Sequence, residues 1–166
     1  MPKDTLLHKS AYKGDVVGIE VALDEKHIDI NAPGAQKRTA LMRASGANHV
    51  GIVELLLGRG ANPKQIDASG RSPLHWAAAS SAYNAAQILC EKELDFNSKT
   101  KSGSAAIHLV AENGHVLFLK LLLTKEIILN EPDGEGKTPY QLAKENGHKS
   151  AAILLKPEGE GCCQIL

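Results

Sequence analysis

Residues 72–78, Ser72-Pro73-Leu74-His75-Trp76-Ala77-Ala78, are the stretch of sequence that decides the fold. Ser72 supplies a hydroxyl of the kind that caps a helix N-terminus, and Pro73 fits the first helical position because the N–H that it lacks would have no partner there. Leu74 and the two alanines form a narrow apolar face that lets a neighbouring helix approach closely. The stretch therefore predicts a short helix that begins at residue 73 and packs against another helix.

A hairpin and a second helix flank this predicted helix. Asp67-Ala68-Ser69-Gly70 has the residues of a tight turn, and Gly70 can adopt the positive φ that such a turn requires. From about Asn84, apolar residues such as Ile88 and Leu89 recur at helical spacing and predict a second helix. The predicted unit is a hairpin, a helix, a tight turn and a second helix.

The same unit recurs along the chain with a nearly constant step. Its first helix opens at Thr5, Thr39, Ser72, Ala105 and Thr138, which are 34, 33, 33 and 33 residues apart. Such units cannot bury their apolar faces alone, so neighbours must complete each other's core. We predict an all-α solenoid of helix-turn-helix pairs in one domain, residues 1–156, followed by a linker and tail at residues 157–166. The predicted copies span residues 5–37, 38–70, 71–103, 104–136 and 137–156.

Composition argues against several functional classes. Nineteen Lys and Arg side chains balance nineteen Asp and Glu side chains, so the net charge gives no electrostatic basis for nucleic-acid binding. We expect no nucleic-acid partner. The N-terminus lacks the apolar core of a secretory signal, and no run approaches the ~20 apolar residues that span a bilayer. The three cysteines form neither a disulfide framework nor a metal pattern, so we expect a cytoplasmic protein without a cofactor.

Several motifs make the chain resemble the ankyrin-repeat family over roughly residues 5–156. These are residues 72–78, Ala111-Glu112-Asn113-Gly114-His115, Leu55-Leu56-Leu57-Gly58-Arg59-Gly60-Ala61-Asn62 and Thr138-Pro139. The resemblance implies an L-shaped solenoid with β-hairpin fingers and a concave face that binds other proteins. Three departures predict less regular turns: Ser81-Ala82 stands in place of Gly-His, and Glu93-Leu94 and Glu126-Ile127 stand in place of Gly-Ala.

Six of the seven histidines occupy fixed positions in the repeating unit. His8, His75 and His108 fall in the first turn of the first helix, and His49, His115 and His148 fall at the turn between the helices. We expect the first three to link the cap hydroxyl to the backbone of the neighbouring finger. Metal ligands must converge on one point, whereas these histidines are spaced along the stack. The sequence also lacks catalytic-triad, metalloprotease and phosphate-loop patterns, so we expect no metal site and no enzymatic activity.

The resemblance implies that the finger tips and the groove-facing ends of the first helices bind the partner. The candidate residues at these positions are Tyr12, Lys13, Gln36, Arg38, Arg43, Ser69, Arg71, Trp76, Lys101, Ser104, Glu112, Asn113, Glu135, Lys137, Glu145 and Asn146. Positive charge dominates the first three copies and negative charge the last two, a gradient that would orient a partner. For each residue singly, a merely solvated side chain is the alternative.

Trp76 is the one tryptophan of the chain and admits two interpretations. It packs against Leu109 of the next copy, or it is an aromatic anchor of the kind that contributes most to interface energies. Cys90, within the second helix of the third copy, is interpreted as a small buried apolar residue.

The tail ends in Cys162-Cys163-Gln164-Ile165-Leu166. Cys163 is fourth from the end, followed by an aliphatic residue and a final leucine, which satisfies the C-a-a-X rule for geranylgeranylation loosely. Cys162 could carry the second lipid that stable anchoring needs, since no polybasic run is present. The alternatives are a tail without function and a C-terminal peptide that another module recognises.

These observations predict a non-catalytic, monomeric module that binds a protein partner through its groove and fingers. The tail adds the hypothesis of a tether at the cytoplasmic face of a membrane. The alternative is a soluble regulator, because small ankyrin proteins include inhibitors of cyclin-dependent kinases and proteasome-assembly chaperones.

Overall fold

The computed structural model describes residues 3–24 and 28–157, and within them the chain is all-α. The helices are α1 (Leu6–Lys13), α2 (Val16–Asp24), α3 (Ala40–Gly46), α4 (Val50–Gly58), α5 (Pro73–Ala79), α6 (Tyr83–Cys90), α7 (Ala106–Glu112), α8 (Val116–Leu122), α9 (Pro139–Glu145) and α10 (Lys149–Leu155), with a short 3-10 helix, η1 (Ala35–Lys37). The predicted helical solenoid is confirmed.

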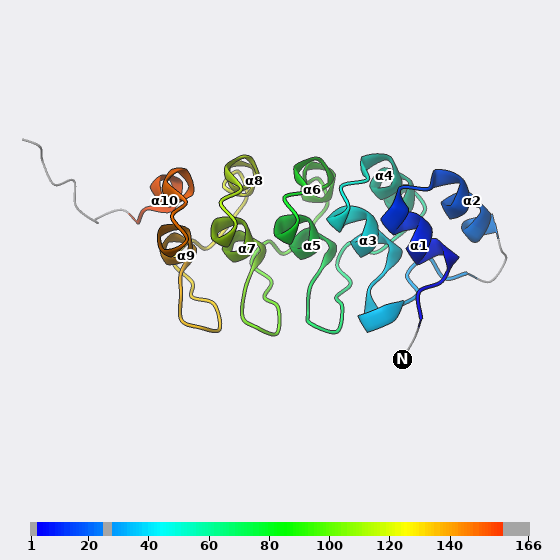
Figure 1. Ribbon diagram of the computed structural model, residues 1–166, viewed down its shortest axis with the longest axis horizontal. Helices are drawn as coiled ribbons and strands as arrows, with labels where there is room; N and C mark the ends of the chain where they lie inside the picture. Colours follow the sequence, from blue (N-terminus) through cyan, green and yellow to red (C-terminus); the bar gives the residue numbers. More distant parts are fainter. Residues whose placement is uncertain (1–2, 25–27, 158–166) are drawn as a thin grey trace, which may run out of the picture.

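The helices lie in two rows (Figure 1). The first helix of each pair (α1, α3, α5, α7 and α9) stacks on the first helix of the next pair, and the second helices form the other row. Hairpin loops, the fingers, project beyond the row of first helices. Each inner pair of helices is therefore covered by a neighbouring pair on both sides.

The first helices begin where the capping residues predict. Ser72 Oγ accepts the backbone N–H of His75 at 3.4 Å, and Pro73 is the first helical residue of α5. Thr39 and Thr138 cap α3 and α9 in the same way. One hydroxyl therefore satisfies a donor that the first turn leaves without a partner.

A left-handed residue ends each first helix and starts the turn into the second. The φ angles are 82° at Gly14, 58° at Asn48, 57° at Ser81, 70° at Gly114 and 75° at Gly147. The prediction of a less regular turn at Ser81 is therefore wrong, since Ser81 adopts the glycine conformation. The prediction is confirmed at Glu93, which does not adopt the positive φ of its counterpart Gly60 (89°).

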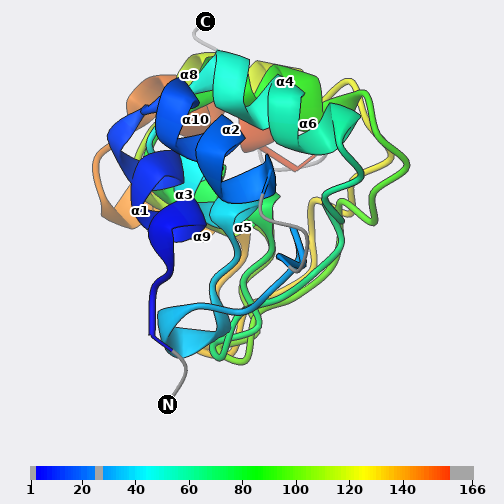
Figure 2. The same cartoon turned by 90° about the vertical axis from the view of Figure 1, so that its right-hand side faces the viewer.

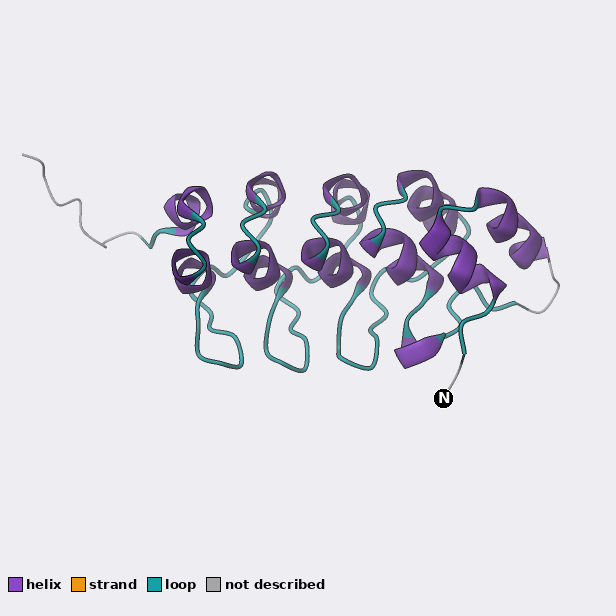
Figure 3. Ribbon diagram, in the orientation of Figure 1, coloured by secondary structure: helices purple, strands orange, loops and turns teal. Residues whose placement is uncertain are grey.

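The fingers are hairpin loops without regular β-strand in the described part of the chain (Figure 3). Each closes with a backbone hydrogen bond, from Gly34 N–H to Arg38 O (2.8 Å), Asp67 to Arg71 (3.0 Å), Thr100 to Ser104 (3.0 Å) and Asp133 to Lys137 (2.9 Å). The β-hairpin fingers that the resemblance implied are therefore too short to form a ladder within one finger.

Neighbouring fingers are joined by one backbone hydrogen bond each. Ala68 N–H donates to Gln36 O (2.8 Å), Lys101 N–H to Ser69 O (2.9 Å) and Gly134 N–H to Ser102 O (3.0 Å). These bonds run along the stack and hold the four fingers in register.

The core lies between the two rows of helices. In α3 the buried residues are Ala40, Leu41, Met42, Ala44 and Ser45, whereas in α4 they are Ile52, Val53 and Leu56. Both rows therefore contribute to the core, and the first helices bury more residues because they are covered by neighbours, second helices and fingers. Cys90 is buried as expected, and burial raises the pKa of its thiol to about 11.

Candidate protein-binding surface

The first helices and the fingers share one face of the stack, which we call the inner face. Viewed along the stack, the fingers of successive pairs superpose in one direction away from the helices (Figure 2). Two depressions lie on this face. The N-terminal depression, about 290 Å³, is lined by Tyr12, Arg38, Met42, Arg43, Gly46, Trp76 and Ser80. The C-terminal depression, about 230 Å³, is lined by Arg71, Ser102, Ser104, Leu109, Glu112, Asp133, Glu135 and Leu142.

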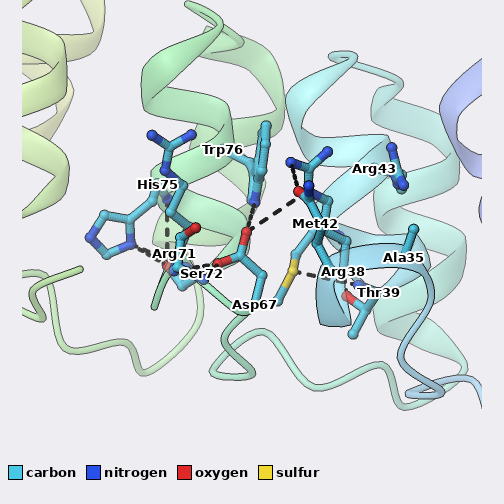
Figure 4. Close-up of polar contacts among 12 residues, drawn as sticks. Ala35, Arg38, Thr39, Met42, Arg43, Asp67, Arg71, Ser72, His75 and Trp76 are labelled. Atoms are coloured by element: carbon cyan, nitrogen blue, oxygen red, sulfur yellow. Dashed lines mark hydrogen bonds and ion pairs between the residues drawn. The ribbon is translucent and has the colours of Figure 1, made fainter. Parts of the chain in front are cut away.

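Trp76 stands at the centre of a polar cluster beside the N-terminal depression. Its Nε1–H donates to Asp67 Oδ2 at 3.1 Å. The guanidinium carbons of Arg38 and Arg71 lie 4.3 and 5.2 Å from the ring centroid, and Figure 4 shows the indole between the two side chains. Neither sequence-based interpretation of Trp76 anticipated this arrangement, in which cation–π contacts orient two arginines.

The buried carboxylate of Asp67 organises this cluster. Asp67 is 5% exposed, and its Oδ1 accepts the backbone N–H groups of Ser69 (2.8 Å) and Arg71 (2.9 Å). Its Oδ2 accepts the Trp76 indole and lies 3.9 Å from Arg38 Nε. One side chain thus shapes the second finger and fixes the position of Trp76.

Three guanidinium groups lie within electrostatic reach of one another. Burial lowers the pKa of Arg38, the positive charges of Arg43 and Arg71 lower it further, and Asp67 and Asp4 act in the opposite direction. Arg43 pairs with Asp4 at 2.6 Å. Both Arg38 Nε and Arg43 Nε are buried without a hydrogen-bond partner in the described chain. The depression therefore keeps unsatisfied donors and incompletely neutralised positive charge.

The C-terminal depression has a net negative charge, because three carboxylates and one guanidinium, that of Arg71, line it. Asp133 lies at the base of the fourth finger, and its Oδ1 accepts the backbone N–H groups of Glu135 and Lys137, each at 2.9 Å. Glu135 is exposed, and Glu112 has no cationic partner within the described residues. Leu109 and Leu142 supply apolar surface between these carboxylates.

The structure gathers half of the sequence-based candidates at the two depressions. Tyr12, Arg38, Arg43 and Trp76 line the N-terminal one, and Arg71, Ser104, Glu112 and Glu135 line the C-terminal one. Gln36, Ser69 and Lys101 lie exposed on finger tips, and Lys13 is exposed at the end of α1. These positions agree with the inner face that the resemblance implied.

Several candidates are partly occupied by internal contacts, among them Gln36, whose Oε1 accepts Arg38 Nη2. Asn113 and Asn146 donate through Nδ2 to the carbonyls of Leu109 (2.8 Å) and Leu142 (2.9 Å). Lys137 Nζ lies 2.8 Å from Glu145 and 3.8 Å from Glu135. The two asparagines therefore cap first helices, and Glu145 holds a lysine of its own pair.

Sequence reasoning missed the acidic partners and the small residues of the surface. The sequence predicts Asp67 only as a turn residue, and the one signal for its role as the indole acceptor is its position shortly before the helix that contains Trp76. Asp4, Gly46 and Ser80 carried no signal of this kind, since their roles depend on contacts between pairs.

The histidines at the start of the first helices contact the next finger's backbone as predicted. The predicted link to a cap hydroxyl is present for His8 and His75 and is wrong for His108, because its cap residue is Ala105 and the backbone N–H of Ala105 donates to His108 Nδ1 instead. Nε2 of His8, His75 and His108 lies 3.0, 3.1 and 2.9 Å from the carbonyls of Ala32, Ser98 and Glu131, which lead into the next fingers. Burial lowers the pKa of His75 and of His108. These imidazoles therefore link each helix pair to the next, and we call them the histidine struts.

No group of three or more His, Cys, Asp or Glu side chains that could hold a metal is found within residues 3–24 and 28–157. Across those same ranges, every helix is too short or too polar to cross a membrane.

Comparison with known proteins agrees with this architecture. The chain matches the family described as Ankyrin repeats (3 copies) over residues 7–100 and 93–164. It is 35% identical over 86 residues to neurogenic locus notch homolog protein 1 of Danio rerio, a match that covers 51% of this chain and 4% of that protein. The chain thus spans a small part of that relative. From the family match over most of its length and the stacked helix pairs, the chain belongs to the ankyrin-repeat family.

Proposed function

We propose that the protein is a non-catalytic interaction module that holds a protein partner on its inner face. The observation that carries this proposal is the pair of oppositely charged depressions between the fingers and the first helices. They contain apolar surface beside charged groups, which is the composition of protein-binding sites. Ankyrin repeats form a protein-interaction fold, and the inner face contains the candidate residues.

Site-specific photo-cross-linking tests the proposal. A benzoylphenylalanine placed at Ser69, on an exposed finger tip, should give a discrete protein adduct in extracts of cells that express the protein. The same probe at Gln87, exposed on the second-helix row, serves as the matched control. No adduct at Ser69, or the same adducts at both positions, would contradict the proposal.

The tether predicted from the tail is carried forward as a separate proposal. Cys162 and Cys163 lie outside the described residues, so the sequence Cys163-Gln164-Ile165-Leu166 is its support. In a eukaryotic cell, a prenylated Cys163 would place the protein at the cytoplasmic face of a membrane. Cys163→Ser should move the protein from the membrane fraction to the soluble fraction, and unchanged fractionation would argue against the tether.

A soluble regulator, such as an inhibitor of cyclin-dependent kinases or a proteasome-assembly chaperone, is the alternative. It would use the same inner face as a monomer and would carry no lipid on Cys163. The intact mass of the protein from its natural source separates the two proposals.

A further inference from the structure

We infer that the inner face binds an extended peptide segment of its partner that carries an anionic side chain against the guanidinium groups of Arg38 and Arg71, which flank Trp76, and a cationic side chain against the carboxylates of Glu112, Asp133 and Glu135. This inference rests on the proposed function and names the chemistry of the partner. The anionic group is a carboxylate or a phosphate, which the test below separates.

The anionic end of the segment is assigned by Arg38 and Arg71. Their guanidinium groups are both held against the ring of Trp76, at 4.3 and 5.2 Å from its centroid. Stacking on an aromatic ring leaves the N–H donors at the edge of a guanidinium able to bind an oxyanion. Arg71 has no hydrogen-bond or ion-pair partner for its guanidinium in the described chain, so its donors are available.

The two nearby aspartates do not satisfy all the guanidinium donors of the three arginines. Asp67 is buried, its Oδ1 accepts backbone N–H groups of the second finger, and its Oδ2 accepts the Trp76 indole N–H. Asp4 satisfies one terminal nitrogen of Arg43, yet Arg43 Nε and Arg38 Nε stay buried without an acceptor. The two Nε donors are buried, and Arg38 Nη2 donates to Gln36 Oε1, so an incoming anion would accept mainly from Arg71. It would also offset the repulsion among three guanidinium groups.

The cationic end of the segment is assigned by Glu112 and the fourth finger. Glu112 is exposed at the end of α7 and, among the described residues, has no cationic partner. Asp133 and Glu135 face the same depression. Lys137 offsets part of this charge through Glu135 and Glu145, but it does not line the depression.

The geometry of the stack fixes the spacing of the two charges. Arg71 flanks Trp76 of α5 and reaches the C-terminal depression, and the three carboxylates lie between α7 and α9, one to two pairs further along. Packed helices lie about 8–10 Å apart, so the two charged groups are roughly 8–20 Å apart. An extended chain advances about 3.3–3.6 Å per residue, so the two charges should be about three to six residues apart.

Synthetic peptides free of aromatic residues test the inference. The probe has two glutamates near one end, two lysines near the other and about three uncharged residues between them. Control peptides have the same composition with adjacent charges, or lysines only. A further arm replaces the glutamates with phosphoserines. Trp76 is the single tryptophan, so its fluorescence reports binding at the assigned site.

The spaced peptide should bind at least about fivefold more tightly than either control. Arg71→Gln should weaken binding about tenfold, the range of a charge-assisted hydrogen bond, and Glu112→Gln should also weaken it. Arg59→Gln and Glu20→Gln, at exposed sites outside both depressions, should leave binding unchanged. Tighter binding of the phosphoserine peptide assigns the anion as phosphate, and tighter binding of the glutamate peptide assigns it as carboxylate.

Equal binding of the spaced and control peptides would overturn the inference, as would equal effects of Arg71→Gln and Arg59→Gln. Thermal unfolding of each variant shows whether the fold is retained. Failure here combined with a cross-link specific to Ser69 leaves the proposed function standing with a partner of different chemistry. Loss of that cross-link is the outcome that removes the proposed function itself.

Discussion

The carboxylate of Asp4 accepts the N–H of Ala35, for which later fingers use a carbonyl of the preceding finger. Its Oδ1 accepts the Ala35 N–H at 2.8 Å. In the three following fingers the equivalent N–H groups, those of Ala68, Lys101 and Gly134, donate to a carbonyl of the preceding finger. Among residues 3–24 and 28–157 no finger precedes that of Ala35, and the Asp4 side chain completes the series and also pairs with Arg43 at 2.6 Å. We call this pair of contacts the Asp4 cap.

Asp4→Ala should destabilise the protein by about 1–3 kcal/mol, because it leaves both Ala35 N–H and the Arg43 guanidinium without this acceptor. Asp4→Asn keeps an oxygen for Ala35 and should cost less. Urea unfolding measures both, and Asp24→Ala, at an exposed site without a polar partner in the described chain, is the control. Equal stability of the Asp4→Ala and Asp24→Ala variants would show that the cap has no energetic role.

The acid sensitivity of this cap follows from the Asp4 pKa. Burial opposes ionisation, but the hydrogen bond from Ala35 and the charge of Arg43 outweigh it and hold the pKa below its ordinary value. The contribution of Asp4 is therefore present above about pH 4, the ordinary value, and is lost as the pH falls through the lower folded value.

Gly134→Ala should push the third and fourth fingers apart. A Cβ at this position would lie 2.3 Å from Ser102 O, the atom that accepts the Gly134 N–H. Overpacking against backbone costs about 1–3 kcal/mol, and amide exchange at residue 134 should accelerate. Gly51→Ala is the matched control: a Cβ there meets nothing within 4 Å, so alanine should stabilise α4 by about 1 kcal/mol. A neutral Gly134→Ala would contradict the close approach.

Most of the fold could be predicted from the sequence because its signals are local and repeat in phase. Ser72 and Pro73 start a helix, and Gly14, Gly114 and Gly147 end one, for reasons that lie within a few residues. The turn at Ser81 differs from the prediction because a serine stands in place of the usual glycine there and still adopts φ 57°. Packing of the adjacent pairs fixes the turn despite this preference.

The candidate surface was predictable only in outline. The position of each residue within the repeating unit places Arg38, Arg71 and Trp76 on one face. It does not show that both arginines flank the indole. The contacts of Asp4 with Ala35 and Arg43 link residues more than 30 positions apart. Such contacts depend on the distance between pairs, about which hydrophobic periodicity says nothing.

Ala105→Ser should stabilise the protein by about 0.5–1 kcal/mol. Ala105 stands at the N-cap of α7 with φ −83° and ψ 169°, nearly the angles of Ser72, but it has no hydroxyl to accept a backbone donor. The new hydroxyl would also face His108 Nδ1, as Ser72 Oγ faces His75 Nδ1 at 2.8 Å. The reciprocal change, Ser72→Ala, should destabilise by about 1 kcal/mol. Shifts of the same sign for both variants in urea unfolding would exclude a capping role.

Stability should fall as the pH decreases from about 7 to 5, because His75 and His108 are held neutral in the folded protein. Ser72 N–H donates to His75 Nδ1 at 3.2 Å, so this nitrogen must accept. Nε2 faces the Ser98 carbonyl at 3.1 Å, so it must carry the proton. A second proton on Nδ1 would break the first contact, and burial, the largest cause, lowers the pKa of both imidazoles.

The sign of the pH dependence follows from which state binds the proton first. The unfolded chain protonates these histidines near their ordinary pKa of about 6.5, which is above the folded value. As the pH falls, proton binding therefore stabilises the unfolded state relative to the folded state. The double variant His75→Gln/His108→Gln should show a shallower dependence in urea unfolding from pH 5 to 8. Glutamine suits this position, since Gln141 Oε1 accepts the Thr138 N–H at 2.9 Å in α9. Some dependence should persist because burial also lowers the pKa of His115. An unchanged slope in the double variant would place the acid sensitivity outside these two struts.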